Sequence, residues 1–382
     1  DMLRLTFPYL LFISLTAFAG GILNAHRRFA IPAFTPVLLN LVLIACALWL
    51  APVLEVPIVA LAWGVFIAGI TQFVFQLPFL GQLRLIPRFR PRFDDAGVRR
   101  VMRLMVPALF AVSVTQINLL LDTVLASTLQ TGSISWLYYS DRLMEFPTGI
   151  LGVALGTVIL PHLSRQQAEA APGAFSRTLN WGLRTSLVFG LPAALGLAAL
   201  AGPLIATLFL SDVFGPDDVA QARLSLMAYA VGLLAFILIK VLAPGYYARQ
   251  DTKTPVKIAV AAMATNMVLN LSFIWTLAHA GLALATSLAA YLNAGLLLRG
   301  LLRAGVLRPD AGWRVLLLRT AAAGALMAAV LVLLAPPLPA WLAMTTLGRI
   351  GTLGLWILVG VIVYFGTLFA LGGRARDVLA RG

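Results

Sequence analysis

The chain has 382 residues, of which 61% are hydrophobic and 11% are charged. Soluble globular proteins are about 45–50% apolar and about 25% charged, so this composition excludes a soluble enzyme, a disordered chain and a fibrous repeat. A net charge of +14 would suggest nucleic-acid binding in a soluble protein. A membrane protein instead carries such residues in its cytoplasmic loops. The sequence therefore predicts an integral membrane protein with no nucleic acid among its partners.

Eleven segments are long and apolar enough to cross a bilayer as helices, which takes about 20 residues each. No strand pattern or soluble domain interrupts them, so we expect an all-α, polytopic transmembrane helix bundle. The segments cover roughly 5–25, 32–54, 57–80, 104–127, 133–160, 182–210, 224–247, 255–278, 281–302, 315–341 and 350–372.

Basic residues gather in alternate loops, namely those that follow the odd-numbered segments. In the other loops, the only basic residues are Arg223 and Arg349. An excess of lysine and arginine marks cytoplasmic loops, so the pattern predicts a cytoplasmic C-terminus. An odd number of spans then places the N-terminus outside. Because the first residue is Asp1 and no signal peptide precedes it, we expect the sequence to be a fragment that lacks an odd number of N-terminal spans.

The loop at 82–103 is the most basic of all. Prolines come early in it, and a helix capped by Asp94 and Asp95 is expected to follow, with an apolar stripe that includes Val98. We interpret this segment as a basic amphipathic helix on the cytoplasmic leaflet. A charged linker between two helical bundles is equally compatible with the pattern.

The fifth segment is the most polar. Ser135, Tyr139, Arg142 and Glu145 follow a helical spacing that places them on one face, with Arg142 near the middle of the membrane. A guanidinium is a planar, permanently charged fork that suits a phosphate or carboxylate. These residues, with the neighbouring Asp141, are therefore candidates for substrate binding. The alternative is an internal ion pair of Arg142 with Asp141 or Glu145.

A second polar set lies on other segments. The fourth contains Asn118 and Asp122, the eighth contains Asn266 and Asn270, and the ninth contains Thr286. A carboxylate in an apolar span needs a cation, a proton or a hydrogen-bond donor. Carboxylate, amide and hydroxyl oxygens suit a small alkali cation, so Asp122, Asn266, Asn270 and Thr286 are candidates for a sodium site. A polar network that packs the helices together is the alternative.

Lys240 lies about two turns from the cytoplasmic end of the seventh segment. Its side chain either extends to the membrane interface or lines a cavity and meets an anionic substrate. The sequence contains no nucleotide-binding, zinc-hydrolase or serine-hydrolase motif. We therefore expect a transporter rather than an enzyme.

Three stretches of the sequence resemble the bacterial lipid II flippase family, also called MurJ or MviN. They are FPYLLFISLTAFAGGILNAHRRFAIPAFTPVLLN, SWLYYSDRLMEFPTGILGVALGTVILPHLS and KVLAPGYYARQDTKTPVK, and the similarity runs through essentially the whole chain. The family belongs to the multidrug/oligosaccharidyl-lipid/polysaccharide exporters. The resemblance implies a two-lobed exporter with two extra C-terminal helices.

In that layout, residues 1–81 are the last three helices of the N-terminal lobe and 82–103 join the lobes. Residues 104–303 form the six-helix C-terminal lobe, and 304–382 contain the two extra helices and the cytoplasmic tail. In the family, this last pair builds a groove for the polyprenyl tail. The resemblance implies a monomer in the bacterial inner membrane that moves lipid II, an undecaprenyl-diphosphate-linked peptidoglycan precursor, to the periplasmic leaflet by alternating access.

The family's central cavity uses several arginines, and Arg142 matches one of them, whereas its companions would lie in the missing portion. Asp122, Asn266, Asn270 and Thr286 match a sodium site described in some members. Asn270 stands where a second carboxylate can occur. Three alternatives remain open: a cation-coupled multidrug exporter, an exporter of another polyprenyl-linked glycan, and a non-transporting scaffold or channel.

Overall fold

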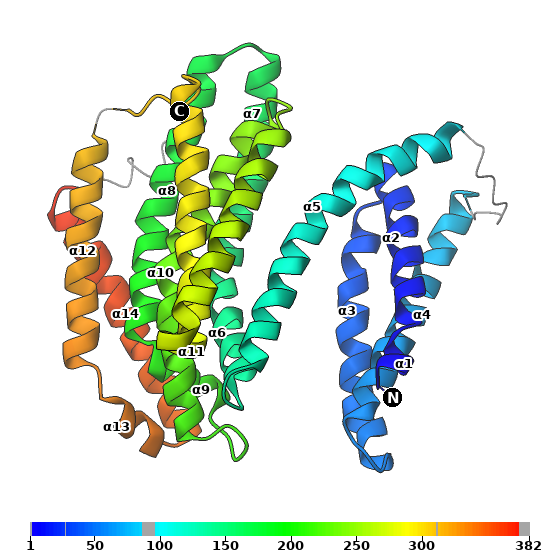
Figure 1. The fold of residues 1–382 in the computed structure, drawn as a ribbon, viewed down its shortest axis with the longest axis horizontal. Coiled ribbons are helices and arrows are strands. Elements are labelled where there is room, and N and C mark those ends of the chain that lie inside the picture. The colour runs from blue at the N-terminus through cyan, green and yellow to red at the C-terminus, as the bar shows by residue number, and fades with distance from the viewer. Residues whose placement is uncertain (1, 27, 86–95, 311, 374–382) are drawn as a thin grey trace. The chain divides into compact units, whose positions relative to one another are not determined.

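The computed structural model describes residues 2–26, 28–85, 96–310 and 312–373. These residues form helices joined by short turns, and no strand occurs among them, which confirms the expected all-α fold. The chain divides into two compact units, residues 1–101 and 102–382 (Figure 1). The finer division into four segments stays a prediction.

The first unit is a small bundle in which one helix packs against two others. The π-helical turn Cys46–Leu50 and the 3₁₀ turn Ala51–Val53 extend its third helix. Ala19, Leu23 and Leu80 form the buried contact between the second and fourth helices. The helices of this unit are α1 (Met2–Thr6), α2 (Tyr9–Ala25), α3 (Ala30–Ala45), α4 (Val59–Gln82) and the start of α5 (Ala96–Ser127).

The second unit is built around its long central helix α10, which packs on α6, α7, α8, α9 and α11. A separate buried cluster joins α12, α13 and α14 to α8. A π-helical turn, Thr148–Val153, follows Pro147 and links α6 to α7. The helices are α6 (Ser133–Pro147), α7 (Ala154–Ala168), α8 (Pro172–Ala199), α9 (Ala201–Phe209), α10 (Pro216–Tyr247), α11 (Lys253–Arg303), α12 (Trp313–Leu334), α13 (Leu338–Ala343) and α14 (Thr346–Ala370).

Helix α11 is a hairpin of two helices rather than one long rod. The backbone of Ala278 leaves the helical region, with φ 48° and ψ −133°. A Cβ on Gly281 would lie 2.7 Å from the carbonyl oxygen of Phe273, so the chain reverses sharply there and glycine is required. The expected spans 255–278 and 281–302 are therefore separate helices.

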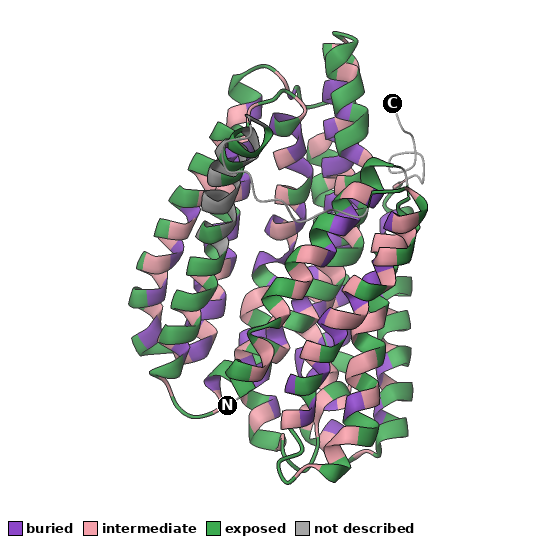
Figure 2. Ribbon diagram, turned by 90° about the vertical axis from the view of Figure 1, so that its right-hand side faces the viewer, coloured by how far each residue is buried: buried purple, intermediate pink, exposed green. Residues whose placement is uncertain are grey.

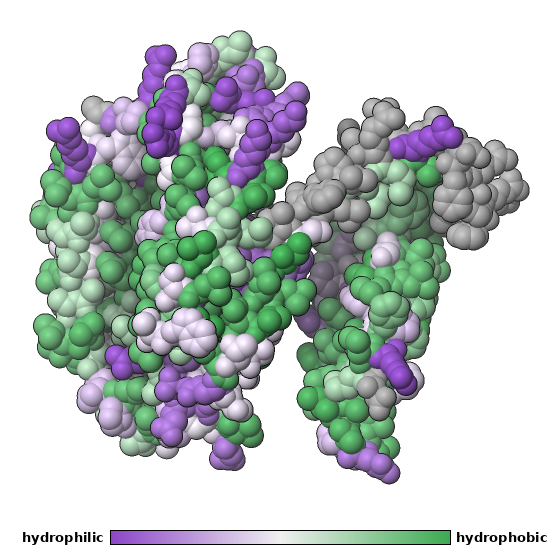
Figure 3. Space-filling model, viewed as in Figure 1, coloured by the Kyte–Doolittle hydropathy of each residue, from purple (hydrophilic) through white to green (hydrophobic). Residues whose placement is uncertain are grey.

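The surface agrees with a membrane location. Nine helical stretches among the described residues are long and apolar enough to cross a membrane. In this count α1 with α2, α3 with the two turns that extend it, and α6 with α7 form one stretch each, and α11 is counted once. Many large apolar side chains are exposed between the helix ends, and Figure 2 shows exposed positions along the outward sides of the helices. Hydrophilic surface gathers at the two ends of the second unit, with a hydrophobic band between them (Figure 3). The count of eleven spans stays a prediction.

Two of the expected spans have different bounds in the structure. The span at 182–210 is broken at Leu200, where α8 ends and α9 begins. The span at 315–341 ends at Leu334, because Pro336 and Pro337 stop the helix and the short α13 follows. The expected cap by Asp94 and Asp95 lies outside the described residues, and from Ala96 onward α5 runs without a break to Ser127.

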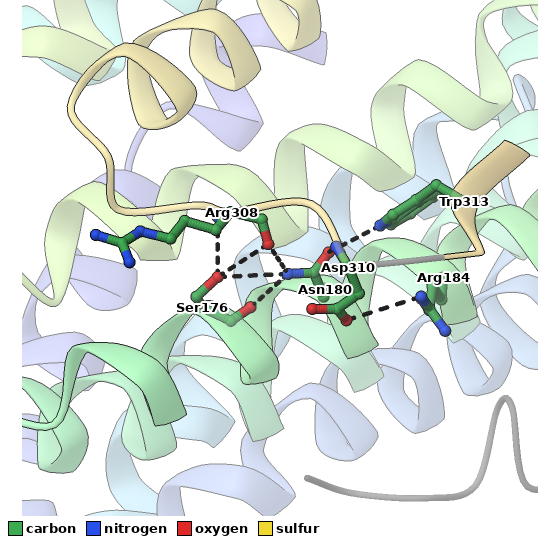
Figure 4. A network of polar contacts seen from close by, with 6 residues as sticks. All are labelled: Ser176, Asn180, Arg184, Arg308, Asp310 and Trp313. Carbon is green, nitrogen blue, oxygen red and sulfur yellow. Dashed lines mark hydrogen bonds and ion pairs between the residues drawn. The ribbon is translucent and has the colours of Figure 1, made fainter.

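A buried amide on α8 attaches the loop that leads into α12 (Figure 4). Asn180 is 1% exposed. Its Nδ2 donates to the carbonyl oxygen of Arg308 at 2.8 Å, and its Oδ1 accepts from Trp313 Nε1 at 2.8 Å. Arg184 adds an ion pair with Asp310 at 3.8 Å. These contacts fix the start of α12 against α8.

Two further contacts hold α14 in place. Tyr364 donates its hydroxyl to the carbonyl oxygen of Val188 on α8 at 2.8 Å. Arg349 was expected in an outer loop, but it is buried in α14 and donates to the carbonyl oxygen of Ala206 on α9 at 2.6 Å. Helices α8, α9, α12 and α14 therefore form a connected wall.

Candidate functional site

That wall encloses one side of a large apolar groove in the second unit. The groove has a volume of about 700 Å³, and α6 forms its other side. Leucine, phenylalanine, proline and glycine residues of α8, α9 and α14 dominate the lining, together with Met327 and Leu331 of α12. Arg142 is the one charged side chain among the groove's described lining residues. A groove of this size and polarity suits a hydrocarbon chain.

Arg142 lies in the third turn of α6 and is held by two neighbours. Its Nη1 is 2.6 Å from Oε2 of Glu145, and its guanidinium carbon lies 5.1 Å from the centre of the Tyr138 ring. The side chains of Arg142 and Glu145 are 56% and 53% exposed. The ion pair offered as the alternative interpretation is therefore present. Both side chains of this pair are also exposed, so the guanidinium retains N–H donors for an anion.

The expected common face of α6 divides between two cavities. Ser135 and Tyr139 line a smaller cavity beside the groove, whereas Arg142 lines the groove itself. Tyr139 turns toward Phe209 and Phe214, with ring centres 4.5 and 5.3 Å apart. Helical spacing alone could not predict this division, because it depends on the end of α9, where Phe209 packs against Tyr139 of α6.

Asp141 and Lys240 lie away from this cavity pair. Asp141 is half-buried and is absent from the lining of both cavities. Lys240 is exposed, and its aliphatic stem packs over Gly152, whose Cβ would lie 3.1 Å from Lys240 Cγ. The described contacts do not connect either residue to Arg142 through a hydrogen bond.

The second polar set comes together between α5 and the first half of α11. Asn270 Nδ2 donates to Asp122 Oδ1 at 2.6 Å, and Asn118 Nδ2 donates to Asp122 Oδ2 at 3.2 Å. Asn266 Nδ2 donates to Asn118 Oδ1 at 3.1 Å. Asp122 thus receives a donor on each oxygen, which is how a helix-packing network satisfies a carboxylate.

Two oxygen atoms in this network have no partner. Oδ1 of Asn266 and Oδ1 of Asn270 are buried and accept no hydrogen bond. Such oxygens, beside a carboxylate, suit a hard cation. Thr286 donates its hydroxyl to the carbonyl oxygen of Leu282 in its own helix at 3.0 Å, so it does not join the hydrogen-bonded set. No group of three or more histidine, cysteine or acidic residues that could hold a metal occurs in the described ranges.

Sequence reasoning missed a polar cluster where α6, α10 and the α11 turn meet. Trp136 Nε1 donates to Asp218 Oδ1 at 2.8 Å. His279 lies 2.6 Å from Ser225 through Nδ1 and 3.1 Å from Gln221 through Nε2. A histidine at the end of an apolar span was the available signal, but its partners come from another helix.

The fold and the groove define the class: a polytopic, all-helical membrane protein with a cation beside a hydrocarbon-sized groove. The comparisons with known proteins name the family. A family model described as "Lipid II flippase MurJ" matches residues 1–350. The chain therefore belongs to the lipid II flippase MurJ family.

Individual relatives agree with this membership. The chain is 50% identical over 381 residues to a probable lipid II flippase MurJ of Vibrio cholerae, with 99% of this chain and 72% of that protein covered. It is 42% identical over 377 residues to the lipid II flippase MurJ of Burkholderia cenocepacia, covering 97% and 73%. Among solved structures, an inward closed conformation of lipid II flippase MurJ matches at a TM-score of 0.80 and 26% identity, covering 99% and 75%.

Proposed function

We propose that this chain carries the lipid-binding part of a lipid II flippase, a transporter that moves a polyprenyl-diphosphate-linked peptidoglycan precursor across the bacterial inner membrane. Family membership supports this function. The observation that carries it is the apolar groove of about 700 Å³ with Arg142 in its lining. The polyprenyl tail of the substrate would lie in the groove, and its diphosphate would contact Arg142.

The physical problem of transport is that a polar, anionic headgroup must cross hydrocarbon while the tail stays in an apolar environment. Arg142 offers the bidentate donors that suit a diphosphate. The Arg142–Glu145 pair is about half exposed and lies about 14 Å from the start of α6. A charged pair at that depth in a membrane needs water or a polar ligand beside it. Alternating access between two lobes would then expose the headgroup first to one side and then to the other.

We further propose that Asp122, Asn266 and Asn270 hold a sodium ion that biases this change between states. The unpartnered amide oxygens of Asn266 and Asn270 support a bound cation. The ion would replace the amide donors now on Asp122, and Thr286 could supply its free lone pairs. We also propose a cytoplasmic C-terminus, which the basic loops support.

A groove-filling substitution tests the proposed function. Gly196 lines the groove, and a Cβ built on it meets nothing within 4 Å, so Gly196→Phe starts from open space and adds a ring to the groove lining. In the full-length protein, this variant should fold normally and lose most of its flipping of a fluorescent lipid II analogue in proteoliposomes.

The matched control is Gly366→Phe. Gly366 lies on α14, its Cβ also meets nothing within 4 Å, and it is absent from the groove lining. The control should flip lipid II at the wild-type rate. Full activity of Gly196→Phe would show that the groove does not hold the tail.

A further inference from the structure

A second cavity adjoins the groove near the start of α6. Its volume is about 520 Å³. Helix α6 contributes one wall, and the turn between α9 and α10 contributes the other. The side chains that give it its chemical character are Ser135, Tyr139, Phe209, Ser211, Phe214 and Asp218.

The cavity combines ring surface with oxygen atoms. Tyr139 packs on Phe209 and Phe214, and the centres of these last two rings are 6.5 Å apart. All three rings are partly exposed. Tyr139 is tilted by 35° against Phe209 and stands edge-on to Phe214, so the three rings form a compact aromatic cluster that offers both ring faces and ring edges. Ser135 and Ser211 add hydroxyl groups to the lining of the same cavity.

Asp218 is a fixed acceptor in the same cavity. Its Oδ1 accepts from Trp136 Nε1 at 2.8 Å, and its Oδ2 accepts from the backbone N–H of Gly215 at 2.9 Å. A carboxylate has about four acceptor positions, so about two remain for a ligand. Rings for the C–H face of a ligand and fixed oxygens for its hydroxyl groups are what a sugar requires.

The cavity also continues the groove. Leu208 borders both. On α6, Ser135 and Tyr139 precede Arg142 by seven and three residues, so they lie about 10 and 4.5 Å along the helix axis from it. Along α6, the order is therefore the aromatic and hydroxyl-lined cavity at Ser135 and Tyr139, the cation at Arg142, and then the groove residues up to Pro147. A polyprenyl diphosphate glycolipid has the same order of sugar, diphosphate and tail.

We propose that this cavity is the saccharide subsite of the flippase and binds the sugar next to the diphosphate. The inference rests on the proposed function, because Arg142 and the groove fix the direction of the substrate. On this proposal the cavity, rather than the groove, gives the protein a higher affinity for a glycosylated lipid than for a bare polyprenyl diphosphate.

The test measures binding to the full-length protein of three lipids with the same tail: the diphosphate alone, the diphosphate with a disaccharide, and the diphosphate with a disaccharide and peptide. Ser135→Ala removes one oxygen atom, and Phe214→Leu removes a ring. Each should weaken both glycosylated lipids about tenfold, as expected for one lost contact, and leave the bare diphosphate unchanged. Asp212→Asn, in the same turn but outside the cavity lining, should change none of the three affinities.

Other outcomes would overturn the inference. Equal weakening of all three lipids would mean that the variants act on the fold or on the diphosphate. Weakening of the peptide-bearing lipid alone would assign the cavity to the peptide, and no change would leave the cavity without a role in binding. Arg142→Ala is the separate control for the proposed function, because it should weaken all three lipids. If it weakens none, the proposed function fails whatever the cavity variants show.

Discussion

Replacing Arg142 by alanine should abolish transport at little cost to folding. The ion pair with Glu145 is 2.6 Å long, but both side chains are more than half exposed. Exposed pairs contribute about 0–1 kcal/mol, and an exposed contact of a cation with a ring contributes about 0.5–1 kcal/mol. Arg142→Ala should therefore lower the free energy of unfolding by at most about 2 kcal/mol.

The expected loss of substrate binding is larger. A hydrogen bond to a charged group contributes about 1.5–3 kcal/mol, and a guanidinium that holds a diphosphate in bidentate fashion makes two. Removing both costs about 3 kcal/mol or more, which corresponds to at least about a hundredfold loss of affinity. Flipping of a fluorescent lipid II analogue in proteoliposomes should fall accordingly, while a thermal unfolding curve moves little.

Two further variants separate the substrate contact from the ion pair. Arg142→Lys should restore little transport, because an ammonium retains the charge but lacks the planar fork. Glu145→Gln removes the carboxylate that Arg142→Ala leaves unpaired. If the double variant regains transport, Arg142 acts as the partner of Glu145 and the reasoning is refuted.

Three other predictions follow from the polar residues. Sodium at ten times its dissociation constant should stabilise the full-length protein by about 1.4 kcal/mol, and Asp122→Asn should abolish this; a wild type indifferent to sodium would favour a packing network. Asn180→Ala leaves Trp313 Nε1 without its acceptor and leaves the Arg308 carbonyl with only the longer bond from Ser176, so it should destabilise the fold by about 1–3 kcal/mol in thermal unfolding, whereas the exposed Asn40→Ala should not. A tag after residue 374 should be protected from external reagents in intact cells and one near Asp217 accessible, and the reverse would refute the orientation.

Much of the fold could be predicted from hydropathy and charge. The apolar segments are separated by turn residues, and the alternation of basic loops checks each assignment against its neighbours. The break at Leu200 could not be predicted, because apolar residues continue across it. Its structural consequence is large, since α9 carries Leu208 and Phe209 to the two cavities.

The residue types of the candidate site were predictable, but their partners were only partly so. Spacing places Asn118 near Asp122 and Asn266 near Asn270, since residues three or four apart share a helix face. Helices α5 and α11 bring the two pairs together through contacts between residues 148 positions apart in the sequence. Helical spacing cannot predict such tertiary contacts. For the same reason Arg349, counted among the loop cations, is buried against a carbonyl 143 residues away.

The central claim is that the groove between α6 and α14 holds the polyprenyl tail. It is tested most directly by irradiating the full-length protein with a lipid II analogue that carries a photoreactive group in its tail and mapping the crosslinked residues by mass spectrometry. We predict crosslinks to groove residues of α8, α9 and α14, such as Leu197, Leu204 and Trp356, and their loss in Gly196→Phe. Crosslinks that lie outside the groove, or that persist unchanged in Gly196→Phe, would contradict the claim.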